Sequence, residues 1–584
     1  MNEFVTYLNS LNNANSSNEN ALAEAQVTNK FYKKVHIDRN LGVYLVEELR
    51  KKPTCVILTG HAGDGKTSLV YQILKTFNIF NEQEGLKKYE QKYSSELGRE
   101  LFYIKDMSEL KEADQIELLK QALLGKKQNI SSIVVSNTGP LIATFKQLIN
   151  NNLVDEITED QVEMELLKLM DENKGLEVRI GDYEILLVNM ARIDNVVLVP
   201  KLLDRITSED LWDTCQLCAK ADACPIYTNY ISVRENKHNI SRFITSYYRW
   251  LFESDRRLTI RQILAQLSYS MTGNQTCDSV MDNYGVEFKF RYHFSNLFFG
   301  YRGLHIYDEA RQIRAIKELY ELELDSKETT YDYDYFVKND FSHLTKATQK
   351  ITSDVWANKL QKYKLKPADY MKTEEPYLLR KAIRRMNILF GQYDEDMLNN
   401  LLDELFSPIF SKYLTYRERK WTIKESRNIK STLYKALHYI LVGTHPEQEK
   451  DKIYLTLQRQ GTGMQNVQLL LGELNDNDMT VIQKYQESAF DNDENHYEIF
   501  IGFSSRKEYR IPLMLMDYFD RIAKGAVSTK INPSLSHGID KMRSHLFSNY
   551  KYRDDEEMIR LLVHTLKGPK LIKLQIDESE IFVD

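Results

Sequence analysis

Short apolar runs alternate with helical patterns in roughly the first two hundred residues of the chain. This alternation predicts an α/β fold, in which a parallel sheet carries helices on both faces. In such a sheet, ligands bind at the carboxyl ends of the strands. The runs that predict strands are residues 54–59, 101–106, 133–137 and 185–189, and the helical patterns are residues 41–49, 68–75, 109–124 and 140–151.

The first apolar run leads directly into a glycine-rich loop that fits the pattern G-x-x-x-x-G-K-[ST]. A strand before it and a helix after it are the context that a phosphate-binding loop requires, whereas a chance match in a glycine turn is the alternative. Lys66 would reach the β- and γ-phosphates of a nucleotide, and the Thr67 hydroxyl would ligate Mg²⁺. We expect nucleotide contacts from Gly60, His61, Ala62, Gly63, Asp64, Gly65, Lys66, Thr67 and Ser68.

Polar residues follow the later strands, where a P-loop nucleotide hydrolase keeps its catalytic groups. Asp106 is the candidate Walker B carboxylate for Mg²⁺, and Glu109 is placed to orient the attacking water, although the usual adjacent Asp-Glu pair is absent. Asn137 is in the position where AAA+ ATPases keep a polar sensor of the γ-phosphate, and Asn189 is a second such candidate. Alternatively, each residue only ends a strand or caps the following helix.

Two arginines near residue 260 are candidates for stabilising the transferring phosphate. Thr259 could begin a helix with Arg261 in its first turn, and Arg257 lies just before it. A guanidinium stabilises the charge that spreads over the phosphoryl group. The alternative is a solvated helix end.

Three of the five cysteines fall within ten residues, at Cys215, Cys218 and Cys224. A C-x-x-C pair can hold two thiolates on one metal, and tetrahedral Zn²⁺ needs four ligands. His238 and Cys277 are candidates for the fourth. An iron–sulfur cluster or free thiols are the alternatives. We expect a structural Zn²⁺ site here rather than a catalytic one.

The composition is that of an ordinary folded protein, with 42% hydrophobic and 28% charged residues among 584. No apolar run approaches the ~20 residues of a membrane span, and the first residues lack a secretory signal pattern. Five cysteines in this length do not suggest a disulfide scaffold. We therefore expect a cytoplasmic protein without membrane contact. The net charge of −6 argues only against wholesale coating of nucleic acid.

The length predicts several domains. Residues 331–445 show mostly helical patterns, whereas residues 452–457 and 497–503 resemble strands and residues 511–526 a helix. The predicted segments are a flexible or helical stretch at 1–30, a P-loop core of the AAA+ type ending in the cysteine cluster at 31–230, a lid-like helical subdomain at 231–330, a helical domain at 331–445 and an α+β domain at 446–584.

In this order, the motifs resemble those of the DptF (DndF) family, the bacterial DNA phosphorothioation-dependent restriction proteins. The resemblance covers about the first 310 residues. It is carried by the loop 60–67, the strand end Lys105-Asp106-Met107-Ser108-Glu109, the cluster Cys215/Cys218/Cys224-Pro225-Ile226, and Leu258-Thr259-Ile260-Arg261.

The resemblance implies an ATPase subunit that works with DptG and DptH against DNA lacking the phosphorothioate mark, touching DNA directly or through these partners. No nuclease motif is evident in the sequence. A slowly hydrolysing ATP-dependent switch or scaffold of another defence complex is the main alternative, and a stand-alone P-loop enzyme such as a small-molecule kinase is a third. The sequence leaves open a homo-oligomer in which a neighbour supplies the catalytic arginine.

Overall fold

The structure, a computed structural model, divides into two compact units. Unit 1 comprises residues 1–401 and 488–494, and unit 2 comprises residues 402–487 and 495–584. The predicted five segments are a finer division, which stays a prediction. The structure describes residues 1–12, 29–80, 85–150, 157–173, 175–283, 285–443, 452–457, 466–503, 508–526, 533–549, 558–565, 568–577 and 580–583.

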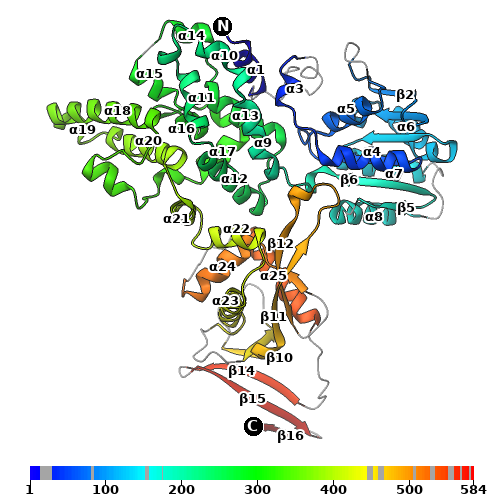
Figure 1. The fold of residues 1–584 in the computed structure, drawn as a ribbon. Coiled ribbons are helices and arrows are strands. Elements are labelled where there is room, and N and C mark those ends of the chain that lie inside the picture. Colours follow the sequence, from blue (N-terminus) through cyan, green and yellow to red (C-terminus); the bar gives the residue numbers. More distant parts are fainter. Residues whose placement is uncertain are drawn as a thin grey trace. The chain divides into compact units, whose positions relative to one another are not determined.

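Unit 1 contains a six-stranded mixed sheet with the order β2-β3-β4-β1-β6-β5 (Figure 1). The four central strands are parallel, as predicted, but β2 and β5 are antiparallel edge strands that the prediction missed. β2 has the polar sequence YEQKYS, so no apolar run marks it. The strands are β1 Cys55–Thr59, β2 Tyr89–Ser94, β3 Arg99–Ile104, β4 Ser131–Val135, β5 Glu177–Ile180 and β6 Tyr183–Asn189.

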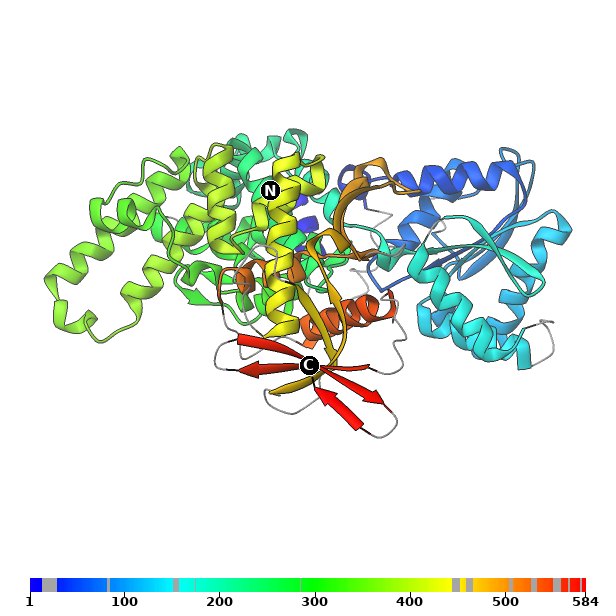
Figure 2. The ribbon, with the colours of Figure 1, turned by 90° about the horizontal axis from the view of Figure 1, so that it is seen from below.

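Helices cover both faces of this sheet (Figure 2), because its central strands are apolar on both sides. One buried cluster joins the sheet to α4 and α5, and another joins it to α6, α7 and α8. These helices lie within a few residues of the predicted patterns, except that α8 was not predicted. They are α4 Asn40–Lys51, α5 Lys66–Thr76, α6 Glu112–Gly125, α7 Thr138–Asn150 and α8 Glu159–Glu172.

The rest of unit 1 is mainly helical. Thr259 caps α13 through a capping box with Gln262, so the predicted helix start is confirmed. Among the described residues, no helix has the length and apolar character needed to cross a bilayer. The elements are α9 Val199–Ile206, α10 Asp213–Gln216, α11 Pro225–Glu235, α12 Lys237–Glu253, α13 Ile260–Thr272, α14 Cys277–Met281, α15 Val286–Arg291, α16 Phe294–Phe298, β7 Tyr301–Arg302, β8 His305–Ile306, α17 Arg314–Glu321, α18 Lys346–Leu365, α19 Pro367–Tyr370, α20 Glu375–Phe390 and α21 Glu395–Leu405, whose last four residues belong to unit 2.

The N-terminal helix α1, Glu3–Leu11, is a buried part of this helical region. Phe4 is fully buried and meets Trp212 edge-on, with ring centroids 5.6 Å apart. A second short helix, α3 Tyr32–Val35, precedes α4. The part of the predicted flexible segment at residues 13–28 lies outside the described residues.

Unit 2 combines helices with antiparallel strands. One sheet has the order β16-β15-β14-β10-β9 and the other has the order β11-β12-β13. The strands predicted near residues 452 and 497 and the helix predicted near 511 are present. The elements are α22 Phe410–Glu418, α23 Ile423–Val442, β9 Ile453–Leu457, β10 Val467–Leu474, β11 Met479–Gln486, β12 His496–Phe503, β13 Glu508–Arg510, α24 Leu513–Ala523, α25 Pro533–Asn549, β14 Met558–Thr565, β15 Gly568–Asp577 and β16 Glu580–Val583.

Candidate nucleotide-binding site

The glycine-rich loop joins β1 to α5 and packs tightly against the start of α13. Gly63 and Gly65 have φ angles of 91° and 85°, in the left-handed region that favours glycine. A Cβ atom at Gly63 would lie 3.0 Å from Thr259 Oγ1 and 3.1 Å from Arg261 Cβ. The loop glycines therefore allow both the tight turn and the close approach of α13.

Asp64 is fully buried and supports the loop from inside. Its carboxylate accepts a hydrogen bond from the His61 N–H (2.9 Å) and one from Arg257 Nη1 (2.8 Å). Arg257 Nη2 also donates to the carbonyls of Met190 (2.8 Å) and Ile193 (3.1 Å). Arg257 was predicted as a catalytic arginine. In the structure its guanidinium instead pairs with the buried Asp64 carboxylate and thereby stabilises the loop.

Lys66 lies at the start of α5 with its ammonium group held over the loop. Its Nζ donates to the carbonyls of Gly60 (2.8 Å) and His61 (2.9 Å) and to Asn137 Oδ1 (3.0 Å). Burial lowers the pKa of Lys66, while nearby carboxylates oppose this effect. The contact with Asn137 brings together two residues that the sequence predicted separately.

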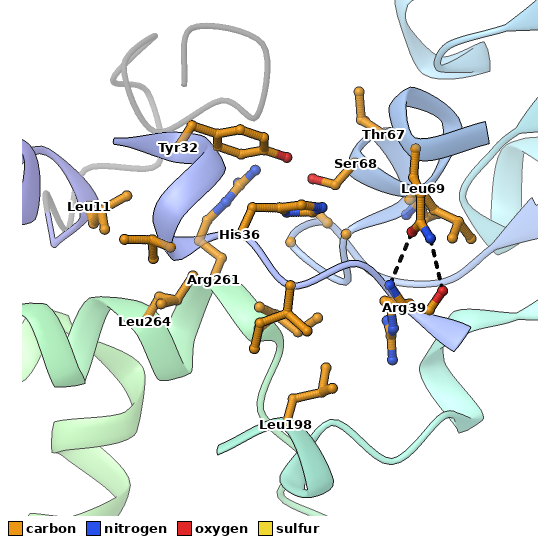
Figure 3. A pocket seen from close by; sticks show the side chains of 18 of the residues that line it. Leu11, Tyr32, His36, Arg39, Thr67, Ser68, Leu69, Leu198, Arg261 and Leu264 are labelled. Carbon is orange, nitrogen blue, oxygen red and sulfur yellow. Dashed lines mark hydrogen bonds between the residues drawn. The ribbon is translucent and has the colours of Figure 1, made fainter. Parts of the chain in front are cut away.

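A cavity of about 240 Å³ opens beside the loop (Figure 3). Loop residues, polar residues that follow β3 and β4, and the first turn of α13 contribute to its wall. Gly60 and Asp64 do not line it. The predicted site residues that do are His61, Ala62, Gly63, Gly65, Lys66, Thr67, Ser68, Asp106, Glu109, Asn137 and Arg261.

Asp106 both lines the cavity and caps a short 3₁₀ helix, Met107–Glu109. Its Oδ1 accepts hydrogen bonds from the Ser108 N–H (2.9 Å) and Oγ (2.7 Å). Glu109, predicted to orient water, forms an ion pair with Lys105, with 3.0 Å between Oε2 and Nζ. The capping explanation for Asp106 is therefore correct, and it does not conflict with a position on the cavity.

Asn189, the second candidate sensor, is not among the residues that line the cavity. Its side chain accepts a hydrogen bond from the Ala191 N–H (3.0 Å) and donates one to the Met170 carbonyl (3.1 Å). These bonds give Asn189 a capping role at the end of β6.

Arg261 extends from α13 along the cavity wall (Figure 3). Its backbone N–H donates to the Gly63 carbonyl at 3.3 Å, which fixes the start of α13 against the loop. Burial lowers the pKa of Arg261, yet within the described part of the chain no carboxylate pairs with its guanidinium. A partly buried cation on a cavity wall is suited to an anionic ligand.

Another part of the cavity wall is apolar and aromatic. The rings of Tyr32 and His36 stack with centroids 4.8 Å apart and an interplanar angle of 18°. Burial lowers the pKa of His36, which favours the neutral imidazole, while Asp38, whose Oδ1 lies 3.4 Å from His36 Nε2, opposes this shift. An apolar and aromatic wall of this kind is suited to contact with a flat ring such as a nucleobase. Its other members are Tyr7, Leu11, Val35, Ile37, Leu198, Leu202, Ile260 and Leu264.

Arg39 and Gln72 support the site, although the sequence did not predict them. Arg39 donates from Nη1 to the Asp64 carbonyl and from Nη2 to Asn195 Oδ1, both at 3.3 Å. Gln72 of α5 accepts from the Arg39 N–H (3.1 Å) and donates to the Arg39 carbonyl (3.0 Å). Only the fold brings these residues together, so no local motif could have revealed them.

The cysteine cluster is gathered by the N-terminus. The backbone N–H of Asn2 donates to Cys277 Sγ (3.4 Å), and its side-chain amide donates to Cys215 Sγ (3.2 Å). Burial raises the pKa of Cys215 to about 11, and Cys224, Cys277 and Cys218 are near enough to add to this shift. Among the described residues, however, no three His, Cys, Asp or Glu side chains are arranged to hold a metal ion.

The chain was compared with known protein families, curated proteins and solved structures. No protein-family model, no curated protein and no solved structure matches the chain.

Proposed function

We propose that the chain binds ATP and hydrolyses it with Mg²⁺. The observation that supports this best is that Lys66, Asp106, Asn137 and Arg261, which come from four parts of the sequence, line one cavity beside a glycine-rich loop. The Tyr32–His36 pair in the same cavity would offer a stacking surface for the base.

The phosphates would lie on the loop. The backbone N–H groups at the start of α5 and the Lys66 ammonium would hold the β- and γ-phosphates, since a helix N-terminus attracts anions. Lys66 would exchange its bonds to the Gly60 and His61 carbonyls for bonds to phosphate oxygens. Asn137 and Arg261 would then contact the γ-phosphate side, where charge develops during transfer.

The cavity also offers the oxygen ligands that Mg²⁺ prefers, from the Thr67 hydroxyl and the Asp106 carboxylate. Both bonds from Ser108 go to Oδ1 of Asp106, so Oδ2 remains for the metal or one of its waters. Bound Mg²⁺ would neutralise charge on the phosphate oxygens.

The biological setting that we propose is a DptF-like restriction complex acting against DNA without the phosphorothioate mark. The support is the ordered set of motifs from the loop to Arg261, together with the large additions to the core, which suit protein partners of the DptG and DptH kind. In this setting ATP turnover would drive assembly or licensing of DNA damage.

ATP hydrolysis by the purified chain tests the activity. We expect Lys66→Ala to lower turnover by roughly 100-fold or more, because the charge that holds the transferring phosphate is lost. Wild type and Lys66→Ala would be assayed with unmodified duplex DNA, with phosphorothioated duplex and without DNA. ATP binding that does not change in Lys66→Ala would refute the site. An ATP turnover rate that is the same with and without DNA would indicate that a partner protein, rather than this chain, senses DNA.

One observation favours a slow ATP-dependent switch as the second candidate. Glu109, the carboxylate that was predicted to orient water, is paired with Lys105. A site that binds ATP without a free general base turns over slowly. Tight ATP binding with negligible turnover, with and without DNA, would support this candidate over the hydrolase.

A further inference from the structure

The turn between β11 and β12 belongs to a different unit from the strands that flank it. Residues 488–494, which we call the docking turn, belong to unit 1, whereas both flanking strands belong to unit 2. Phe490 is 6% exposed and is a member of the buried cluster that joins the six-stranded sheet to α4 and α5. The docking turn is therefore part of the core of unit 1.

An aromatic contact anchors the docking turn. The Phe490 ring meets the Tyr44 ring edge-on, with centroids 5.6 Å apart. A Cβ atom at Gly175 would lie 2.6 Å from the Phe490 ring, so the chain leaves space for this ring by having glycine there. This close packing indicates that the docking turn makes a specific contact with the core of unit 1.

Polar contacts surround the anchor. Asn40 Nδ2 donates to Asp491 Oδ1 at 2.8 Å, and Lys201 of α9 forms an ion pair with Asp493. Ser488 Oγ donates to Glu494 Oε2 at 2.9 Å and holds the turn closed.

The contact between Asn40 and Asp491 lies next to Arg39, the residue that joins this region to the phosphate-binding loop. The Glu494 carboxylate also lies in the electrostatic field of Arg39 and Asp194. Arg39 is almost completely buried and donates to the backbone carbonyl of Asp64 in the loop and to Asn195. Asp64 in turn holds the His61 N–H. The docking turn thus bonds to the residue that follows Arg39, and Arg39 bonds to the backbone of the loop.

We propose that the docking turn positions the phosphate-binding loop through Arg39, so that its docking and nucleotide binding strengthen each other. The effect on the loop follows from the contacts alone, whereas the effect on nucleotide affinity rests on the proposed ATP site. Because coupling between two binding events is reciprocal, a bound nucleotide would also hold the docking turn in place.

Charge reversal at the ion pair tests the proposal. Asp493→Lys places two ammonium groups together and should weaken docking, and the exchange Lys201→Glu with Asp493→Lys should restore it. Asp204→Lys is the matched control, because Asp204 also lies on α9 and pairs with a lysine, Lys237, at similar exposure. Phe490→Asp is the stronger variant, since it puts a charge into the buried cluster.

The primary measurement is hydrogen exchange of the full-length protein without nucleotide, which is independent of any ATPase activity. We expect Asp493→Lys and Phe490→Asp to speed hydrogen exchange in the docking turn and in residues 60–67. The double variant Lys201→Glu/Asp493→Lys and the control Asp204→Lys should exchange at rates near those of wild type. Fast exchange in the docking turn with wild-type exchange in residues 60–67 would overturn the proposal. Unchanged exchange in the docking turn of Phe490→Asp would overturn the docking itself.

The second measurement is the Kd of a fluorescent ATP analogue for the same variants. We expect about fivefold weaker binding in Asp493→Lys, which corresponds to about 1 kcal/mol. The double variant Lys201→Glu/Asp493→Lys should bind the analogue with wild-type affinity. Wild-type affinity in a variant whose turn is shown to exchange fast would refute the coupling. If the wild type does not bind the analogue, the ATP site is refuted. The hydrogen-exchange result would then still test whether the docking turn positions the loop.

Discussion

Arg257 and Arg261 are four residues apart, yet the structure gives them different tasks. Arg257 pairs with the buried carboxylate of Asp64, whereas Arg261 lines the cavity without a carboxylate partner among the described residues. A local sequence pattern cannot separate these tasks, because both depend on what lies opposite each guanidinium.

Replacing the two arginines separately should reveal this difference. Arg257→Ala leaves a buried carboxylate unpaired, which typically costs about 3–5 kcal/mol, so we expect a Tm lower by several degrees. Arg261→Ala should leave the Tm close to that of wild type and lower turnover by about 10²-fold or more. Arg192→Ala, which breaks an exposed pair with Asp171, is the control for both measurements. Equal effects of the two variants on Tm would contradict these assignments.

At the scale of elements, strand ends and helix starts assemble the site. β3 ends just before Asp106 and β4 just before Asn137, and the loop places Lys66 at the first position of α5. The start of α13 closes against the loop at Gly63. A capping residue can thus also line the cavity, as Asp106 does.

The cysteine cluster joins α10, α11 and α14 near the N-terminus, and zinc binding there stays a prediction. We expect one Zn²⁺ per chain by elemental analysis, held after rotation of the cysteine side chains, and its loss with a lower Tm in Cys215→Ser/Cys218→Ser. Cys55→Ser, which changes a buried cysteine in β1 away from the cluster, is the control for metal content. Wild-type protein purified without metal chelators and found free of metal would reject the prediction.

At the scale of the whole molecule, the docking turn carries a group that titrates near neutral pH. Burial raises the pKa of Glu494 from 4.5 to about 7; Asp194 and Asp491 add to the rise, and Ser488 and Arg39 oppose it. The folded protein therefore holds a proton that the unfolded chain releases between pH 4.5 and 7. The contribution of this group to stability is greatest below pH 4.5 and declines as the pH rises through 7.

Glu494→Gln should remove this dependence. At pH 5 the variant and wild type should have similar Tm values, because Glu494 is then largely protonated in the folded state. At pH 8 the variant should be the more stable, by at most about 3 kcal/mol. Thermal unfolding from pH 5 to 8 measures this, and a difference in Tm that is the same at every pH would contradict the pKa of Glu494.

By itself, the sequence determined the local features of this protein. The apolar runs predicted the four parallel strands, the glycine pattern predicted the strand–loop–helix segment, and Thr259 predicted the start of α13. These features were readable because they depend on burial and backbone geometry over a few consecutive residues. The polar edge strand β2 was missed because its burial is too weak to leave an apolar pattern.

Tertiary structure alone decided which side chains meet. It paired Arg257 with Asp64, gave Asn189 a capping role, bonded Arg39 to the loop, and joined the neighbouring Asn40 to Asp491, which is 451 residues later in the chain. Electrostatic and packing energies depend on distance in space, and the fold sets that distance independently of sequence separation. The local motif therefore predicted where phosphate would bind, whereas only the fold showed what holds that loop in place.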